Sequence, residues 1–452
     1  MAVMEIGQLI PIISTRSCLV FRQLICVLYF TPLELADGTL YGGVVNLRGI
    51  QYYNNLINEL IANGKVPYVT LFHWDLPQAL EEEFGGFLNR RIVKEFRYFA
   101  DICFSHFGDR VKHWFTLNEP WSFSYYGYVL GTLAPGRCSS WQHKNCTGGN
   151  SGEEPYWVTH NQILAHAAAV KVYRDRYQSY QKGGIGITLV SQYYEPCSDS
   201  NSGDEAVQRG LDFMLGWFLH PITYGDYPET MRSLVGERLP KFSQEQSKLL
   251  VGSFDFLGVN YYTTYYAVDA PKSNGEHPSY LTDSQITFLS KLDTLQILYA
   301  GNSDWLYIYP KGMRKLLNYI KQDYKDPPMF ITENGVSEDD DPTLALIEAL
   351  NDTIRRDYIE DHLCCLNEAI KEDGINMLGY FVWSLMDNFE WNSGSSVRFG
   401  VNYVDYKHGL HRYAKLSALW FKRFLSEEGS VSIPRISLDR GKDTYSVSSS
   451  VI

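Results

Sequence analysis

The sequence has 452 residues, of which 45% are hydrophobic and 20% are charged, and its formal net charge is −12. This ordinary globular composition excludes a disordered chain, a collagen and a coiled coil, and the acidic balance disfavours a protein that tracks nucleic-acid phosphates. The length suffices for one α/β barrel of about 250 residues or more. Aromatic residues make up 15% of the chain, which fits a filled core or a site for ligands with apolar faces and polar edges.

The N-terminal residues predict neither a cleaved leader nor a membrane anchor. The start, MAVMEIGQLIPIIS, carries Glu5 and has no basic region ahead of its apolar residues, so it is a weak match to a secretory signal. The best apolar run, Cys18 to Phe30, is interrupted by Arg22 and Gln23 and falls short of the about 18–20 residues that a spanning helix needs. We therefore expect no membrane partner.

Six apolar, β-branched or aromatic runs recur along the chain, each followed by polar, Gly or Pro residues. They lie at 66–75, 113–121, 184–190, 254–262, 328–335 and 377–388. Apolar residues at helical spacing predict helices over 92–107, 156–178 and 354–370. Strands that alternate with helices indicate a parallel sheet covered by helices, and uniformly apolar runs indicate strands buried on both faces.

Polar residues crowd the C-terminal ends of these runs, which is where a (β/α)₈ barrel builds its active site. We therefore predict an α/β protein with a (β/α)₈ barrel. Only six strands are recognisable where such a barrel has eight, so we expect a barrel that is incomplete at its N-terminus.

Two glutamates stand directly after buried strands. Glu119 follows one apolar run and precedes Pro120, and Glu333 follows another and precedes Asn334. Most glutamates are solvated surface charges, but a charge at the end of a doubly buried strand must be paired or used. If both strands belong to one closed barrel, the two carboxylates face one cavity, and such a pair suits the cleavage of a glycosidic bond.

The cysteines and sequons leave the cellular compartment open. Eight cysteines in a chain of this length do not form a dense disulfide framework. Cys138 and Cys146, however, lie eight positions apart in a loop with Gly and Pro, where they could close a small bridge. Glycosylation sequons begin at Asn145 and Asn351, although such short patterns often occur by chance. Together these features suggest an ancestry in the secretory pathway, in contrast to the missing leader.

Several blocks carry a resemblance to a known family. They are TLNEP (116–120), ITENG (331–335), HWDLPQAL (73–80), FGGF (84–87), NYYT (260–263), WSLMDNFEW (383–391) and RFGVNYVDY (398–406). In these motifs and in their order, the sequence resembles glycoside hydrolase family 1, and specifically its plant β-glucosidases. The resemblance runs from about Gly38 to about Leu425. Relatives in this family are mostly secreted, vacuolar or plastid proteins.

The resemblance implies a retaining β-glucosidase that releases terminal β-D-glucosyl residues from small O-glucosides. Glu119 would be the general acid/base and Glu333 the nucleophile that forms a covalent glucosyl-enzyme, with the two carboxyl groups about 5–5.5 Å apart. Tyr262 would donate to Glu333 and hold it ionised and aligned. Asn118 would bind the 2-hydroxyl of the sugar. The remaining implied contacts to the substrate are His73, Trp383, Glu390, Trp391 and Phe399.

The identity of the acid/base residue favours O-glucosides over thioglucosides. In related plant thioglucosidases a Gln replaces the acid/base Glu, because the thioglucoside aglycone is a good leaving group that needs little protonation. Glu119 can protonate the alkoxide or phenoxide of an O-glucoside. The sequence has no HExxH motif and no Cys/His set with ligand spacing, so no metal or other cofactor is implied.

The N-terminal part departs from the family pattern. Relatives open with a strand whose Gln grips the glucose, followed by a strand whose Arg pairs with the nucleophile, and residues 1–34 resemble neither block. Without that Arg, the pKa of Glu333 should rise. We predict a non-family segment over 1–37, the barrel domain over 38–427 and a loose Ser-rich tail over 428–452. QLIPIIS or FRQLICVLYF could add a helix or a strand of its own. Ser395 also stands where relatives have an aromatic residue.

Three readings of function stay open on the sequence. The first is the retaining β-glucosidase. The second is an inactive or impaired family member, kept for sugar binding or produced by an alternative transcript or a mispredicted gene start. The third is a transglucosidase, which shares the covalent intermediate but transfers the sugar to an alcohol instead of water.

Overall fold

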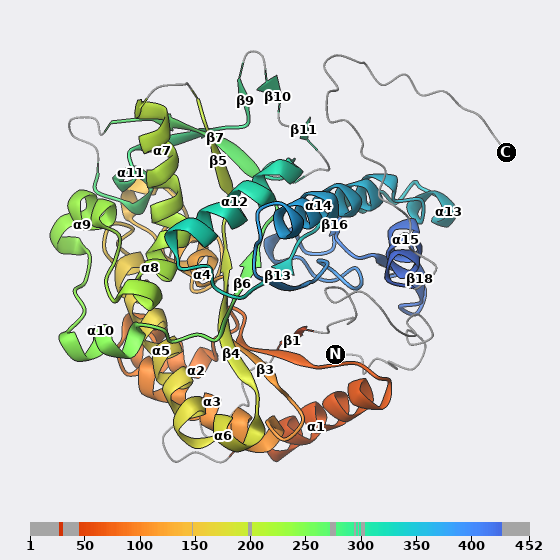
Figure 1. Cartoon of the computed structure of the whole chain (residues 1–452), viewed down its shortest axis with the longest axis horizontal. Coiled ribbons are helices and arrows are strands. Elements are labelled where there is room, and N and C mark those ends of the chain that lie inside the picture. The colour runs from red at the N-terminus through yellow and green to blue at the C-terminus, as the bar shows by residue number, and fades with distance from the viewer. Residues whose placement is uncertain are drawn as a thin grey trace.

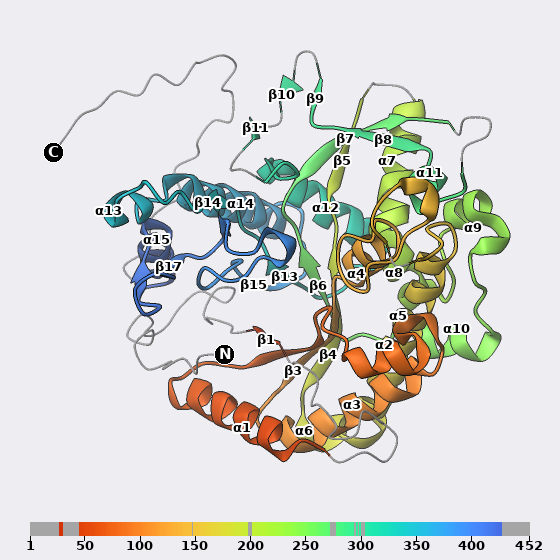
Figure 2. The same ribbon diagram turned by 180° about the vertical axis from the view of Figure 1, so that it is seen from behind.

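The computed structural model describes residues 27–29, 45–146, 148–197, 201–271, 277–292, 295–296, 298–299 and 303–426. A central sheet of seven strands runs through the molecule, with helices on all sides of it (Figures 1 and 2). Its strand order is β1-β2-β3-β4-β6-β13-β15, and every neighbouring pair is parallel. The bounds are β1 Val27–Tyr29, β2 Tyr68–Phe72, β3 His113–Asn118, β4 Gly184–Val190, β6 Phe256–Asn260, β13 Met329–Glu333 and β15 Met377–Tyr380. The six predicted strands are confirmed.

The three helices predicted from apolar spacing are also confirmed, as α3 Ile92–Phe107, α5 Glu154–Arg176 and α14 Thr353–Lys371. Figure 1 shows α1 (Leu47–Ala62) and α3 along one side of the sheet and α12 (Pro310–Asp323) with α14 on the other. The other α-helices are α2 Gln78–Phe84, α4 Pro120–Tyr128, α6 Gln178–Gln181, α7 Asn201–Leu211, α8 Trp217–Tyr224, α9 Glu229–Val235, α10 Gln244–Leu250, α11 Tyr280–Asp283, α13 Leu346–Ala349 and α15 Leu416–Leu425.

Smaller sheets lie outside the central one. One contains β5 (Tyr193–Pro196), β7 (Thr264–Asp269) and β8 (Ile286–Leu289). The others are pairs of short strands: β9 (Lys291–Leu292) with β10 (Leu295–Gln296), β11 (Leu298–Tyr299) with β12 (Tyr307–Ile308), β14 (Glu338–Asp339) with β16 (Val397–Arg398), and β17 (Asn402–Val404) with β18 (Arg412–Ala414).

Aromatic side chains inside the central sheet show that it curls into a barrel. The ring of Tyr68, on β2, lies 5.4 Å from the ring of Phe381, which follows β15, although five places separate these two strands in the sheet order. Phe115, Phe256 and Phe330 complete this buried cluster. Strands from opposite ends of the sheet therefore share one interior, as a closed or nearly closed barrel requires.

The N-terminal segment supplies a strand of this barrel. β1 pairs with β2 in parallel, with Val27 opposite Tyr68 and Tyr29 opposite Thr70, so FRQLICVLYF contributes a strand, one of the two outcomes considered for it. β1 and β15 are the two ends of the sheet, and among the described residues no eighth strand joins them. QLIPIIS and the tail 428–452 lie outside the described residues. No helix in the described part of the chain is long and apolar enough to span a bilayer.

Candidate active site

Glu119 is held at the junction of a strand and a helix. It follows β3, its own φ is 42°, and Pro120 opens α4 directly after it, a position where a proline costs no backbone hydrogen bond. The side chain is only 7% exposed. Its Oε1 accepts a hydrogen bond from Asn260 Nδ2 at 2.7 Å, and its Oε2 accepts one from Ser122 Oγ at 2.7 Å. Both oxygens of this buried carboxyl are therefore satisfied.

Glu333 lies at the corresponding end of another strand. It is the last residue of β13 and is also 7% exposed. The hydroxyl of Tyr262 donates to its Oε2 at 2.6 Å. Burial and the nearby carboxylates raise the pKa of Tyr262 well above its usual range, so the phenol keeps its proton and acts as a donor. This contact agrees with the predicted orienting role of Tyr262.

Asn260 joins the two carboxyl groups, a function that the sequence interpretation did not assign to it. It is fully buried at the end of β6, opposite Glu333 in the strand register. Its amide nitrogen donates to Glu119 and, at 3.2 Å, to Asn118 Oδ1, while its amide oxygen accepts from Thr332 Oγ1 at 2.6 Å. Its place at a strand end within NYYT is the signal that could have identified it.

The two carboxyl groups share one electrostatic environment. Burial raises the pKa of Glu119, against the hydrogen bonds from Asn260 and Ser122. The pKa of Glu333 is raised well above its usual range by burial and then by the charge of Glu119, against hydrogen bonds from Tyr262 and Asn260. No basic side chain among the described residues counters either rise. The rise for Glu333 has the predicted direction, but its largest cause is burial, and the effect of the missing Arg stays a prediction.

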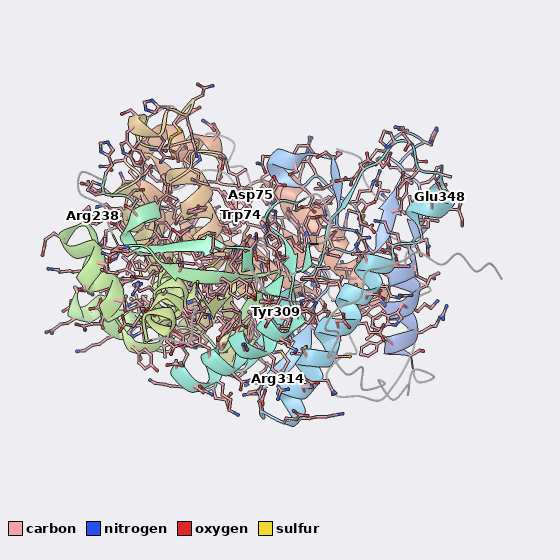
Figure 3. All side chains as sticks on the ribbon, turned by 90° about the horizontal axis from the view of Figure 1, so that it is seen from above. Trp74, Asp75, Arg238, Tyr309, Arg314 and Glu348 are labelled. Atoms are coloured by element: carbon pink, nitrogen blue, oxygen red, sulfur yellow. A yellow bond between two sulfur atoms is a disulfide. The ribbon has the colours of Figure 1, made fainter. Side chains whose placement is uncertain are left out.

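His73 is a neutral hydrogen-bond partner of Asn118. It follows β2, and burial lowers its pKa to about 3. Its Nε2 lies 3.2 Å from Asn118 Nδ2, and since an amide nitrogen only donates, Nε2 is the acceptor. Trp74, at a φ of 73°, donates from Nε1 to the carbonyl of Asn118 at 3.0 Å. Trp74 and Asp75 lie next to each other near the middle of the view from above (Figure 3).

The remaining predicted contacts lie around this histidine and around Tyr262. The ring of His73 is 5.5 Å from that of Trp391 and 6.3 Å from that of Trp383, and Trp383 Nε1 donates to Glu390 Oε1 at 3.3 Å. The ring of Phe399 is 6.3 Å from that of Tyr262. Burial raises the pKa of Glu390 to about 7. The structure thus brings together all nine residues predicted for catalysis and substrate binding.

Buried hydrogen bonds brace the strand ends from behind. Asn334, next to Glu333, is fully buried and donates to the carbonyl of Tyr261 at 2.7 Å and to the hydroxyl of Tyr358 at 3.0 Å. The Tyr358 hydroxyl in turn donates to the carbonyl of Tyr262 at 3.0 Å. Helix α14 therefore fixes the backbone of both the predicted nucleophile and its phenolic partner.

A buried ionic cluster holds the loop that carries Trp383 and Glu390. Asp387, in the middle of this loop, accepts from Arg398 Nη1 at 2.5 Å and from Lys415 Nζ at 3.0 Å, and its oxygens also accept from backbone N–H groups. Burial lowers the pKa of Lys415 to about 8. The satisfied charges anchor this loop to the C-terminal strands and to α15.

An aromatic residue that the sequence interpretation missed lies beside Tyr262. The ring of Trp305 is 5.7 Å from the Tyr262 ring, and 42% of the residue is exposed. A half-exposed indole next to Tyr262 offers an apolar surface at the rim of the candidate site. No motif surrounds Trp305 in the sequence, so only its spatial neighbour identifies it.

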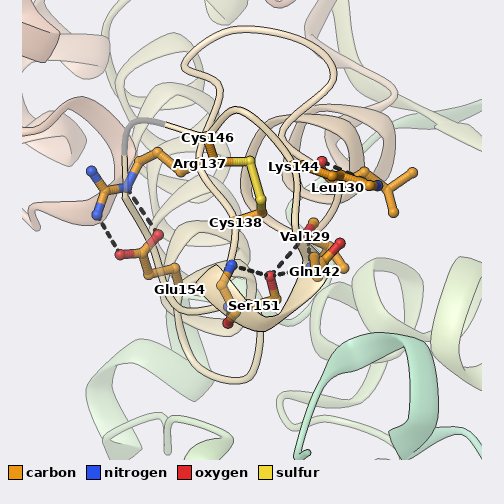
Figure 4. The surroundings of a disulfide bond; sticks show 10 residues. Val129, Leu130, Arg137, Cys138, Gln142, Lys144, Cys146, Ser151 and Glu154 are labelled. Carbon is orange, nitrogen blue, oxygen red and sulfur yellow. Dashed lines mark hydrogen bonds and ion pairs between the residues drawn. A yellow bond between two sulfur atoms is a disulfide. The ribbon is translucent and has the colours of Figure 1, made fainter.

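The predicted Cys138–Cys146 bridge is present and closes a loop after α4, with the two Cα atoms 5.6 Å apart (Figure 4). Beside it, the Ser151 hydroxyl donates to the carbonyl of Val129 at 2.9 Å. The two sequon asparagines, Asn145 and Asn351, are exposed, and their glycosylation stays a prediction. Within the described ranges no three His, Cys, Asp or Glu side chains gather as a metal site would require.

Comparison with known proteins gives one consistent match. The family model for glycosyl hydrolase family 1 matches residues 36–430. Beta-glucosidase 12 of Oryza sativa subsp. japonica is 54% identical over 391 residues, which are 86% of this chain and 76% of that protein. An isoflavonoid 7-O-beta-apiosyl-glucoside beta-glycosidase of Dalbergia nigrescens is 53% identical over 411 residues, covering 91% and 75% of the two chains.

Solved structures agree with this match. A crystal structure of a rice beta-glucosidase superposes with a TM-score of 0.84 at 48% identity, covering 86% of this chain and 81% of that chain. A mutant of the same rice enzyme, in a covalent complex with Glc from GA4GE, gives the same TM-score, identity and coverage. A glucose complex of a beta-glucosidase from Humicola insolens has a TM-score of 0.81 at 38% identity, covering 87% and 80%.

Proposed function

Since this chain belongs to glycosyl hydrolase family 1, we propose that it is a retaining β-glucosidase that hydrolyses O-β-glucosides through a covalent glucosyl-enzyme. The observation that carries this proposal is the pair of buried carboxyl groups at the C-terminal ends of β3 and β13. Each has its own hydroxyl donor, and Asn260 lies between them. Such a pair suits the double displacement of retaining glycosidases.

The first step is the formation of the glucosyl-enzyme. Glu333 attacks the anomeric carbon, and a bond forms between its carboxylate oxygen and that carbon as the bond to the aglycone oxygen breaks. Glu119 gives its proton to the departing oxygen, which leaves as a neutral alcohol. The hydrogen bond from Tyr262 supports the ionised form of Glu333 that this attack requires.

The second step returns the enzyme to its starting state. Glu119, now a carboxylate, takes a proton from water, and the water oxygen attacks the anomeric carbon as the bond to Glu333 breaks. The product is glucose with its anomeric configuration retained. Because Glu119 acts as an acid in one step and as a base in the next, both of its protonation states must be tolerated in the buried site.

The residues around the pair would bind the glucosyl group. Asn118 is placed beside Glu119 and would bind the 2-hydroxyl. The neutral His73, whose Nε2 accepts from Asn118, would donate from Nδ1 to another hydroxyl, and Glu390 would accept hydrogen bonds from hydroxyls. The rings of Trp383, Trp391 and Phe399 would cover the apolar faces of the sugar. Trp305, half-exposed at the rim, would contact the aglycone.

Labelling with a slow substrate tests this proposal. A 2-deoxy-2-fluoro-β-glucoside with a dinitrophenyl leaving group should form a stable adduct that intact mass spectrometry detects and peptide mapping places on Glu333. Glu333→Gln should take no label. Glu119→Gln should still be labelled, because a dinitrophenolate leaves without protonation, but it should lose activity on alkyl glucosides. A folded wild-type protein that stays unlabelled would contradict the proposal.

A second candidate, a sugar-binding member with impaired turnover, is favoured by one observation. Among the described residues no cation neutralises Glu333, and its pKa is raised well above the usual range. A protonated Glu333 cannot attack. This candidate predicts that glucose binds, by calorimetry, while an aryl β-glucoside is not hydrolysed even at pH values above 8; hydrolysis that increases with pH supports the glucosidase instead.

A further inference from the structure

The two oxygens of Glu119 have partners of different chemical kinds. Oε1 accepts from Asn260 Nδ2. The orientation of this amide group is fixed because its oxygen accepts a hydrogen bond from Thr332 Oγ1. Oε2 faces the hydroxyl of Ser122, which is 3% exposed and stands at the third position of α4. An amide nitrogen can only donate, whereas a hydroxyl can donate or accept.

This difference determines which oxygen of Glu119 carries the acid proton. A proton on Oε1 directed at Asn260 would set two hydrogens against each other, so the protonated carboxyl keeps Oε1 as an acceptor. The proton therefore resides on Oε2. Ser122 can meet either state. Its hydroxyl donates to the carboxylate, and it can accept from a protonated Oε2 in the free enzyme after rotation; when that proton points to the bound substrate, the hydroxyl donates to the remaining lone pair of Oε2.

We propose that Ser122 is a positioning residue of the acid/base: its hydroxyl makes Oε2 the oxygen that gives the proton to the leaving group and stabilises the carboxylate that remains. This inference rests on the proposed function. When the proton moves from Oε2 to the departing aglycone oxygen and the glycosidic bond breaks, negative charge develops on Oε2. The Ser122 hydroxyl then donates to that charge, and hydrogen bonds to charged groups are stronger than neutral ones.

The same contact assists the first chemical step but not the second. In the first step Glu119 gains charge, so the Ser122 donor lowers the barrier whenever the leaving group needs the proton. In the second step the Glu119 carboxylate takes a proton from water and becomes neutral, so a hydrogen bond that stabilises its charged form does not lower the barrier. Loss of Ser122 should therefore slow the acid step for poor leaving groups and leave the base step undiminished.

Other ionisable groups around Glu119 do not replace this contact. Glu333 lies across the site from Glu119, and burial together with the charge of Glu119 raises the pKa of Glu333, Tyr126 and Tyr262. His73, which reaches the site through Asn118, is neutral because burial lowers its pKa to about 3. None of these groups donates to Oε2; within the described part of the chain, that oxygen accepts its hydrogen bond from Ser122.

The kinetic test compares two leaving groups in one variant. In Ser122→Ala, the ratio of kcat/KM for methyl β-glucoside to that for dinitrophenyl β-glucoside should fall by about tenfold, from the loss of a hydrogen bond to a charged group. The ratio cancels any change in ground-state protonation, because both substrates start from the same free enzyme. The kcat for the dinitrophenyl glucoside, limited by the second step, should not fall.

Two variants provide the controls. Ser124→Ala removes a hydroxyl of the same helix that bonds to Thr159 and Gln162 and not to Glu119, and should leave the ratio unchanged. Ser122→Thr keeps a hydroxyl and should restore the ratio. An equal loss of activity on both substrates in Ser122→Ala, or the same fall in ratio in Ser124→Ala, would overturn the proposal.

A second measurement does not depend on activity. In protein labelled with ¹³C at the glutamate side-chain carboxyls, the Glu119 resonance is assigned by its absence in Glu119→Gln. Its titration should move to higher pH by about one unit in Ser122→Ala, because the charged form loses a donor. An unmoved titration overturns the role of Ser122, whereas a wild type that titrates as expected but hydrolyses nothing contradicts the proposed function alone.

Discussion

Glu390 is a buried carboxyl whose charge opposes folding, and replacing it should stabilise the protein at neutral pH. The residue is 8% exposed, and burial raises its pKa from 4.5 to about 7, against hydrogen bonds from Trp383 and Asn388. Glu390→Gln keeps the size and the acceptor for Trp383 but removes the charge. The stability of the variant relative to wild type should therefore depend on pH.

The shift in pKa sets the size and the direction of this effect. Below about pH 4.5 the folded and unfolded chains both hold the proton, and the stabilising contribution of the neutral group is fully present. As pH rises from 4.5 to 7, only the folded form keeps the proton, so the free energy of unfolding decreases. A shift from 4.5 to about 7 corresponds, at 1.36 kcal/mol per pKa unit, to about 3 kcal/mol.

Urea unfolding at pH 5, 6, 7 and 8 measures the effect. The free energy of unfolding of Glu390→Gln minus that of wild type should increase with pH by about 3 kcal/mol in total and level off above pH 7. Glu237→Gln is the matched control, since that side chain is 94% exposed, and its difference should stay near zero. A difference for Glu390→Gln that is constant with pH would refute the reasoning.

The same substitution should act in the opposite direction on function. At pH 8 a charged Glu390 would, on the proposed function, accept hydrogen bonds from sugar hydroxyls, and hydrogen bonds to a charged group contribute about 1.5–3 kcal/mol. Glu390→Gln should therefore lower kcat/KM for an aryl β-glucoside by about 10- to 100-fold at pH 8. Glu390→Gln should therefore be more stable than wild type but less active on the glucoside. This combination is expected for a residue that contributes to substrate binding at a cost in stability.

Three further outcomes follow from named contacts. Tyr262→Phe removes the phenol donor of Glu333, so the pKa of Glu333 should rise further; kcat/KM should fall, with its acid limb at higher pH in a pH–rate profile. Lys415→Met breaks a buried pair with Asp387 and should cost about 3 kcal/mol or more of unfolding free energy in urea. Cys138→Ser should cost about 2–3 kcal/mol, and a reducing agent should then have no further effect on its thermal unfolding.

The strands and the main helices could be predicted because their signal is local. Five of the six apolar runs form strands that are buried on both faces, whereas Leu378 of β15 is exposed. Helix α3 begins and ends at the predicted residues. The polar residues at the strand ends lie close together because parallel strands end on one side of a barrel. The N-terminal strand β1 could not be predicted uniquely, since a short apolar run fits a buried helix as well as a strand.

The contacts around the carboxyl groups could not be predicted in the same way. The function of Asn260 depends on a distance across the intervening strand β4, and that of Ser122 on the turn by which α4 leaves β3. Trp305 stands outside any motif, and its ring reaches Tyr262 only because the chain returns to the barrel rim. Each of these contacts joins residues from different elements of the fold, and the spacing of residues along the sequence does not predict such contacts.

The hydroxyl groups of Tyr262 and Ser122 distinguish the surroundings of the proposed nucleophile from those of the proposed acid. Two charged carboxylates in one buried site repel, so Glu119 and Glu333 hold one proton between them over a range of pH. Asn260 lowers the pKa of both groups and therefore cannot decide which of them holds it. Tyr262 donates only to Glu333 and Ser122 only to Glu119. Since a phenol is a stronger donor than an alkyl hydroxyl, these two contacts favour charge on Glu333, the residue that would attack. They act against burial and the charge of Glu119, which raise the pKa of Glu333 well above its usual range.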